Sequence, residues 1–222
     1  MLKTGITWNQ LPTALVGCSG VTCWRRAAEL DRGRRLAGPA RTAAGPDARA
    51  RRTRPGPLCG RRLAHPRAQR GDHVGPSPVD RARPGSKHHL ICEAGGIPLA
   101  VSLTGGHRND ITQLIPLVDA IPPIRGRRGR PRRRPGELFA DRGYDHDSYR
   151  RQLRQRGITP RIARRGVAHG SGLGKQRWVV ERGFAWPHAF ERLRTRYEHR
   201  ADIHLGLRQL TACLSHSVTK QG

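Results

Sequence analysis

Two acidic residues lie in segments that suit metal-assisted chemistry. Residues 138–140 are apolar and predict a short strand, which Asp141 ends before Gly143 breaks it. A carboxylate at the end of a strand is held on rigid backbone while its oxygens reach the rim of the sheet, where a metal ion can bind. Glu181 lies in an aromatic, apolar segment of helical character, and a buried carboxylate is costly unless it is paired or metal-bound. Taken alone, the two residues also fit an Asp that ends a strand and a Glu on a helix flank.

Strands and helices are expected to alternate around these carboxylates. Strands are predicted at residues 88–92, 97–103 and 158–163, and helices at residues 110–121 and 147–157. The last strand is expected at an edge of the sheet, because Pro160 has no N–H for a central ladder. His88 and His89 are adjacent on a predicted strand and point to opposite faces, so they cannot both bind one ion. This order predicts an α/β fold, a mixed sheet flanked by helices.

The chain is strongly basic, with a formal net charge of +27 that comes mostly from arginine. Such a charge predicts a polyanionic partner rather than a particular fold. An arginine-dense loop at residues 125–134 comes directly before the predicted strand of Asp141, so we expect it to neutralise DNA phosphates, with a passive solvated loop as the alternative. The arginines predicted to bind DNA are Arg125, Arg127, Arg128, Arg130, Arg132, Arg133 and Arg134, together with Arg177 and Arg182 on either side of Glu181.

Several classes of protein are disfavoured by composition. No apolar run approaches the length of a membrane span, and no charged-then-apolar signal sequence opens the chain, so we expect no membrane partner. The 5 cysteines lack paired Cys-x-x-Cys spacing, which argues against a zinc site. Free thiols in a reducing cytoplasm are the better interpretation.

A change of composition sets apart the region from Arg25 to Arg70, which consists mostly of Arg, Ala, Gly and Pro. Its large apolar side chains are Leu30, Leu36, Leu58 and Leu63. High charge with low hydrophobicity cannot offset the entropy of the chain, so we predict that residues 25–74 are largely disordered. Two origins are considered: a basic linker that binds phosphates, and a reading-frame slip in GC-rich DNA.

The chain from Gly75 to about Leu214 resembles transposases of the insertion-sequence IS5 family, which are of the DDE type. The resemblance rests on residues 75–90, 105–110 and 162–174 and on the segments around Asp141 and Glu181. It implies a ribonuclease-H-like domain in which Asp141 is the second acidic residue and Glu181 the third. Arg177 matches the Arg of the Tyr-x-x-Arg-x-x-x-Glu signature of related transposases, although Gly174 replaces the Tyr.

The resemblance also implies a reaction: phosphodiester cleavage at transposon ends and transfer of the 3′-OH into target DNA, with two Mg²⁺ ions held by three carboxylates. It implies DNA as the partner, with a possible homo-oligomer on DNA, and a cytoplasmic, nucleoid-associated location in a bacterium. The family's first Asp lies on the first strand, in a phrase like Val-Asp-Ser-Ser-His. At that place residues 60–67 contain no carboxylate, so we expect the first strand to be missing and this copy to be inactive.

The resemblance divides the chain into three parts. Residues 1–24 resemble the later part of the family's N-terminal helical domain, so we expect a truncated remnant in which Trp8 and Trp24 lack a core. Residues 25–74 are the disordered segment, and residues 75–216 the catalytic domain. The likeness stops near Arg26 and returns at Gly75 with the intervening length preserved, which favours the reading-frame slip over a linker.

Three hypotheses follow for the function. The first is an insertion-sequence transposase by descent whose product is inactive. The second is an active nuclease or transposase with a substitute ligand, for which Asp80 is the nearest carboxylate. The third is a basic nucleic-acid-binding protein without transposition activity, for which arginine content is the only argument.

Overall fold

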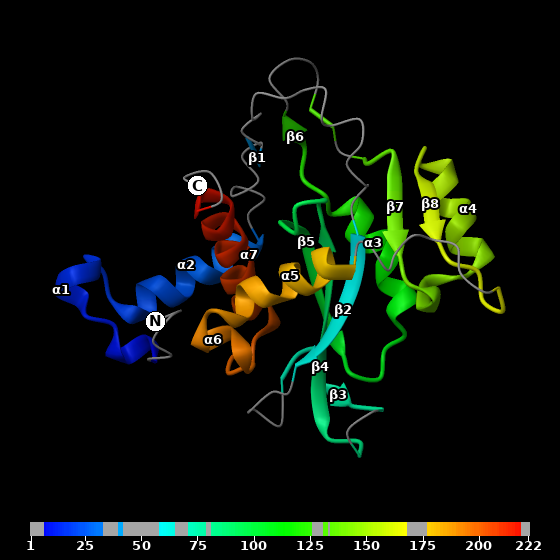
Figure 1. The fold of residues 1–222 in the computed structure, drawn as a ribbon. Coiled ribbons are helices and arrows are strands. Elements are labelled where there is room, and N and C mark those ends of the chain that lie inside the picture. The colour runs from blue at the N-terminus through cyan, green and yellow to red at the C-terminus, as the bar shows by residue number, and fades with distance from the viewer. Residues whose placement is uncertain are drawn as a thin grey trace.

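A mixed sheet with helices packed against it organises the chain (Figure 1). The computed structural model describes residues 7–32, 40–41, 58–64, 71–78, 81–125, 131–132, 134–167 and 177–218. The main sheet has six strands in the order β3-β4-β2-β7-β8, with β5 also paired to β4. Its strands are β2 (Leu58–Ala64), β3 (Gly75–Pro76), β4 (Pro84–Cys92), β5 (Pro98–Gly105), β7 (Glu137–Ala140) and β8 (Thr159–Ile162). A separate parallel pair joins β1 (Ala40–Arg41) to β6 (Ile124–Arg125).

The helices fall between and after these strands. They are η1 (Trp8–Gln10), α1 (Thr13–Val16), α2 (Gly20–Arg32), η3 (Asp110–Gln113), α3 (Leu114–Asp119), η4 (Arg142–Tyr144), α4 (Asp147–Gln155), α5 (Arg177–His188), α6 (Glu191–Arg194) and α7 (Ala201–Val218). In the described part of the chain, none of these helices has the length and apolar character that crossing a membrane requires.

The elements predicted after residue 84 are confirmed. β4 and β5 form the expected hairpin, closed by a hydrogen bond from Glu93 N–H to Ile97 C=O of 2.9 Å. Asn109 caps η3 through its side chain, which accepts from Ile111 N–H, and α3 ends before the two prolines. α4 ends next to Gly157, whose positive φ of 74° suits a helix C-terminus. β8 lies at the edge of the sheet, paired with β7.

The prediction of a missing first strand is wrong. β2 pairs with β4 over its whole length, from Leu58 opposite Cys92 to Ala64 opposite Ser86, and runs parallel to β7. The prediction that Arg25 to Arg70 has no packed structure is therefore wrong for β2, and also for the part of α2 that it covers. The physical reason is that β2 is held by backbone hydrogen bonds from two neighbouring strands, which do not require large apolar side chains. The other residues of 25–70 lie outside the described residues, apart from β1.

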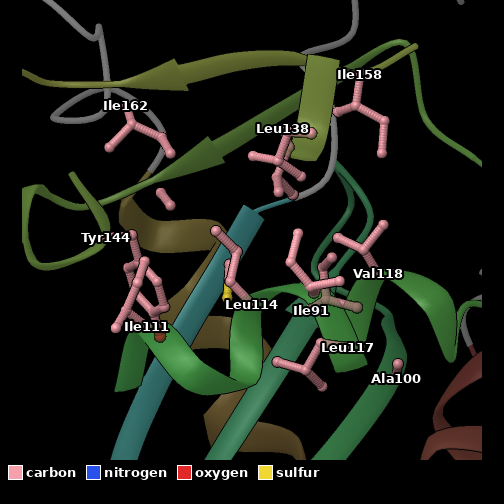
Figure 2. Packing of buried hydrophobic residues seen from close by; sticks show 14 of the residues in the cluster. Ile91, Ala100, Ile111, Leu114, Leu117, Val118, Leu138, Tyr144, Ile158 and Ile162 are labelled. Atoms are coloured by element: carbon pink, nitrogen blue, oxygen red, sulfur yellow. The ribbon is translucent and has the colours of Figure 1, made fainter. Parts of the chain in front are cut away.

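Two apolar clusters cover the two faces of the sheet. On one face, α3 and α4 pack against alternate residues of the strands (Figure 2). This cluster includes Cys59, Ile91, Leu114, Leu117, Leu138, Ala140, Tyr144, Leu153 and Ile158. On the other face, α5 supplies Val179 and Phe184 against Leu90, Cys92 and Phe139. Because successive side chains of a strand point to opposite faces of the sheet, this alternation determines which residues face α5.

The N-terminal helices pack on the C-terminal ones, which corrects the prediction that Trp8 and Trp24 lack a core. Both indoles are partly buried against a cluster that includes Ala27, Ala28, Leu193, Ile203 and Leu207. The Trp8 indole N–H donates to Glu198 at 3.2 Å, and the Arg200 guanidinium lies 4.7 Å from the centre of the Trp24 ring. The sequence of residues 1–24 is too short for its own core, but α6 and α7 supply the missing surface.

A buried polar contact fastens α7 to β4. His88 Nε2 lies 2.9 Å from His204 Nε2, and its Nδ1 lies 2.9 Å from a guanidinium nitrogen of Arg208. Arg196 donates to the Ser86 hydroxyl at 2.7 Å in the same region. All of these side chains are buried. Since His89 bonds instead to Thr104 at 2.8 Å, the two adjacent histidines do point to opposite faces, as predicted.

Gly183 allows α5 to lie directly on the sheet. A Cβ placed on this residue would be 2.3 Å from Cys92 Sγ and 3.0 Å from a methyl group of Leu90. We therefore predict that Gly183→Ala destabilises the protein by about 1–3 kcal/mol through overpacking, which outweighs the gain of roughly 1 kcal/mol in helix propensity. Urea unfolding measures the change, and Gly136→Ala is the control because a Cβ there meets nothing within 4 Å. A more stable Gly183→Ala protein would contradict the close contact.

Stability should fall on acidification below about pH 6.5. Burial lowers the pKa of both His88 and His204 well below the ordinary value of 6.5, and the positive charge of Arg208 lowers both further. Below that pH the unfolded chain binds protons that the folded chain excludes, so the stabilisation is present above the unfolded pKa and is lost as the pH falls. Each such proton contributes a slope of about 1.4 kcal/mol per pH unit.

The free energy of unfolding, measured from roughly pH 7.5 to pH 5.5, tests this dependence. His204→Leu should flatten the slope, because one of the two titrating groups is gone. His199→Leu removes an exposed imidazole and should leave the slope unchanged. Equal slopes in the parent and His204→Leu would contradict the assignment.

Candidate active site

Asp141 stands at the carboxyl end of β7, as predicted. Leu138, Phe139 and Ala140 are buried, and Asp141 follows them half-buried at the edge of the sheet. Its Oδ1 accepts a hydrogen bond of 2.7 Å from Gly143 N–H and caps η4. The second carboxylate oxygen is available for a ligand at the rim, because a single acceptor atom satisfies the cap.

The turn that carries Asp141 is tied to the segment after β8. Asp145 is the centre of this connection: its carboxylate accepts from Arg150 Nε at 2.7 Å and from Arg165 backbone N–H at 2.8 Å. Arg150 also donates to Ile162 C=O at 2.7 Å. The side chains of Asp145 and Arg150 are 7% and 6% exposed, so this is a buried ion pair. The turn after β7 and the segment after β8 are therefore held as one unit.

Electrostatics at Asp145 favour the ionised carboxylate. Burial acts to raise its pKa, but the Arg165 amide and the Arg150 guanidinium together hold it below its ordinary value. The pair was not predicted from the sequence, because Asp145 and Arg150 are joined through a turn and a helix rather than by a simple helical spacing. A signal was present in the clustering of Asp145, Asp147 and Arg150 directly after Asp141.

Glu181 lies on α5, which crosses the face of the sheet that includes Phe139 (Figure 1). The helix is oriented by Arg182, whose stem lies against Gly96 in the turn between β4 and β5, at the end of the strands away from Asp141. Glu181 is exposed. The residues of α5 that pack on the sheet include Val179, Gly183 and Phe184, and Glu181 lies outside this packed face. That Glu181 and Asp141 meet at one site stays a prediction.

The position for a further carboxylate on β2 is held by Gly60. Leu58 pairs with Phe139, so one step of two residues along these parallel strands brings position 60 level with Asp141. A Cβ on Gly60 would lie 2.1 Å from Val180 Cγ1, which leaves no room for a side chain. The next position on this face of the strand is 62, an arginine. Among the described residues, no three His, Cys, Asp or Glu side chains come together as a metal site.

Cys59 lies on β2 near Asp141. Burial raises the pKa of the Cys59 thiol to about 12, and the negative charge of Asp141 contributes to the increase. The thiol itself belongs to the opposite face, in the cluster with Tyr144 and Leu138. It is therefore protonated at neutral pH and poorly suited to bind a metal.

Three of the predicted DNA-binding arginines that the structure describes lie at the end of the strands away from Asp141. Arg132 and Arg134 are exposed and precede β7, at the end opposite to Asp141, and Arg125 forms part of β6. Arg182 lies at the β4–β5 turn, and Arg177 begins α5. Arg127, Arg128, Arg130 and Arg133 lie outside the described residues, as does Asp80. The loop at 125–134 therefore leads into the end of β7 that lies away from Asp141.

A second buried polar group lies on the α3 face of the sheet. Lys87 Nζ bonds to Asp110 Oδ1 at 2.9 Å and to Arg108 C=O at 2.7 Å, and His89 Nδ1 is 4.0 Å from the same carboxylate oxygen. These contacts hold the loop from Gly105 to Asn109 onto the sheet. Sequence reasoning did not assign this group, although residues 105–110 were noted as a distinctive phrase.

Comparison with known proteins identifies relatives of the chain. Residues 62–215 match the family described as transposase DDE domain. The chain is 62% identical over 141 residues to a protein of Burkholderia cepacia named as a transposase for insertion sequence element IS402. The alignment covers 64% of this chain and 67% of that protein.

Asp145→Asn should destabilise the protein by about 3–5 kcal/mol, because it leaves the Arg150 charge buried without its carboxylate. Glu137→Gln is the matched control, since its pair with Arg161 is exposed and should contribute at most about 1 kcal/mol. Chemical unfolding at neutral pH measures both. Equal effects of the two substitutions would show that the buried pair does not hold the turn.

Proposed function

Because the chain belongs to the transposase DDE domain family of insertion sequences, we propose that it binds DNA as a transposase does and fails to complete strand cleavage. The single observation that carries this proposal is Gly60. It occupies the place on β2 that is level with Asp141, and it supplies neither a carboxylate nor room for one. Asp141 and Glu181 are the two acidic residues that we assign to the site.

A two-magnesium site does not fit the residues present. In two-metal catalysis the ions lie about 3.5–4 Å apart and are bridged and anchored by several carboxylates. Asp141 and Glu181 are the carboxylates that we assign to the site, and among the described residues no three acidic, imidazole or thiolate side chains come together as a metal site. Positioning and charge stabilisation account for most of the catalysis in phosphoryl transfer, so the loss of one anchor should be severe.

DNA affinity should survive the loss of catalysis. It depends on arginine side chains that neutralise phosphates, and these contacts need no metal ion. The net charge of +27 supports a large electrostatic contribution that is largely independent of sequence. With DNA as its partner, the protein would be nucleoid-associated in the cytoplasm.

We also propose that the residues between about 26 and 75 result from a reading-frame slip. The support is the abrupt change to an Arg, Ala, Gly and Pro composition in this stretch. The coding DNA tests it directly: restoring the frame should regenerate a strand that contains an aspartate. A frame that yields no such strand would contradict the slip.

The purified chain should bind labelled duplex DNA in a salt-sensitive manner and should not cut it in Mg²⁺ or Mn²⁺. The duplex carries the ends of the insertion sequence, and products are separated on a denaturing gel. Asp141→Ala should bind as the parent does. Cleavage by the parent that disappears in Asp141→Ala would overturn the inactive assignment and would show that another group replaces the missing carboxylate.

A further inference from the structure

Two exposed arginines are fixed on the backbone beside Asp141. Arg142 donates from its guanidinium to Val167 C=O at 2.7 Å. Arg165 donates to Arg142 C=O at 3.3 Å and lies 3.4 Å from Gly143 C=O. These bonds cross between the turn after β7 and the segment after β8, so both guanidinium groups are at the carboxyl edge of the sheet.

Neither of these charges is matched by a carboxylate in the part of the chain that the structure describes. Five other arginines at the surface do have such a partner. The exposed or partly exposed pairs are Arg156–Asp119, Arg161–Glu137, Arg164–Asp147, Arg194–Glu191 and Arg200–Asp202. In contrast, Arg142 and Arg165 bond to carbonyl oxygens, which orient a guanidinium without neutralising it. Their charges are thus left for an anion from outside.

The support for the two arginines is rigid. The buried pair of Asp145 and Arg150 joins the same two segments, and Asp145 accepts the backbone N–H of Arg165 itself. A guanidinium held in this way loses little conformational entropy on binding, and its planar donors match the oxygens of a phosphate. The two guanidinium groups are therefore oriented before any ligand binds.

Arg142 and Arg165 lie at a different end of β7 from the described arginines of the loop at 125–134. β7 is four residues long, so its ends are roughly 13 Å apart. The described arginines of that loop precede β7, whereas Arg142 directly follows Asp141. A phosphate bound by the loop would lie at the far end of the strand, and a phosphate bound by Arg142 and Arg165 would lie next to the acidic residues.

We propose that Arg142 and Arg165 form a clamp for a phosphodiester of the DNA strand that passes Asp141. The inference rests on the proposed function and goes further, because it names the residues that position the strand at the acidic edge. The clamp acts on the DNA backbone, so its contribution is the same for any sequence.

The test is the affinity of the full chain for a labelled DNA duplex as a function of salt concentration. Arg142→Ala with Arg165→Ala should weaken binding at least tenfold and reduce the slope of log K against log salt by about 1–2, as expected for one or two lost phosphate contacts. The control is Arg156→Ala with Arg161→Ala, which removes the same charge from arginines that have carboxylate partners. The control should retain the parent's slope within about half a unit.

A second variant, Arg142→Lys with Arg165→Lys, keeps the charge and removes the planar donors. The clamp predicts partial recovery of the slope with affinity still below that of the parent. Equal losses in the clamp and control variants, or full recovery by lysine, would overturn the clamp in favour of general charge attraction. A parent chain that does not bind DNA at all would instead overturn the proposed function, so the two failures are distinguishable.

Discussion

The close contact between α5 and the sheet is the constraint on which the rest of the structure depends. Gly60 on β2 and Gly183 on α5 remove side chains at the two points where helix and strands approach most closely. Val179 and Phe184 then reach Leu90, Cys92 and Phe139, and the orientation of α5 follows from these contacts. That orientation places Val180 over Gly60 and fills the space beside it. The packing of α5 on the sheet is therefore close at both glycines.

The sequence predicted the elements whose pattern is local. The hairpin of β4 and β5, the cap at Asn109 and the edge position of β8 all follow from short-range turn chemistry and alternation. Asp141 was found for the same reason, since an apolar run that ends in Asp and Gly is read within a few residues. The prediction failed for β2. Its neighbouring strands hold it in the sheet, so its composition need not show a typical strand pattern.

Tertiary partners also account for the other failures. Trp8 and Trp24 lack a core within residues 1–24, and only the fold shows that α6 and α7 provide one. The buried pair of Asp145 and Arg150 depends on how α4 meets β8, which no spacing rule gives. For Glu181, sequence reasoning anticipated a helix with an inward face, and the residue proves to be exposed on the flank of that helix.

β2 has a consequence for how a protein of this kind can change over time. A stretch rich in arginine and poor in apolar residues still occupies the centre of the sheet, because β4 and β7 act as templates for its backbone. The close contact at Gly60, where a Cβ would lie 2.1 Å from Val180 Cγ1, favours a small residue at that position. Pairing with two neighbours can therefore hold a strand in the sheet independently of the side chains that the strand carries.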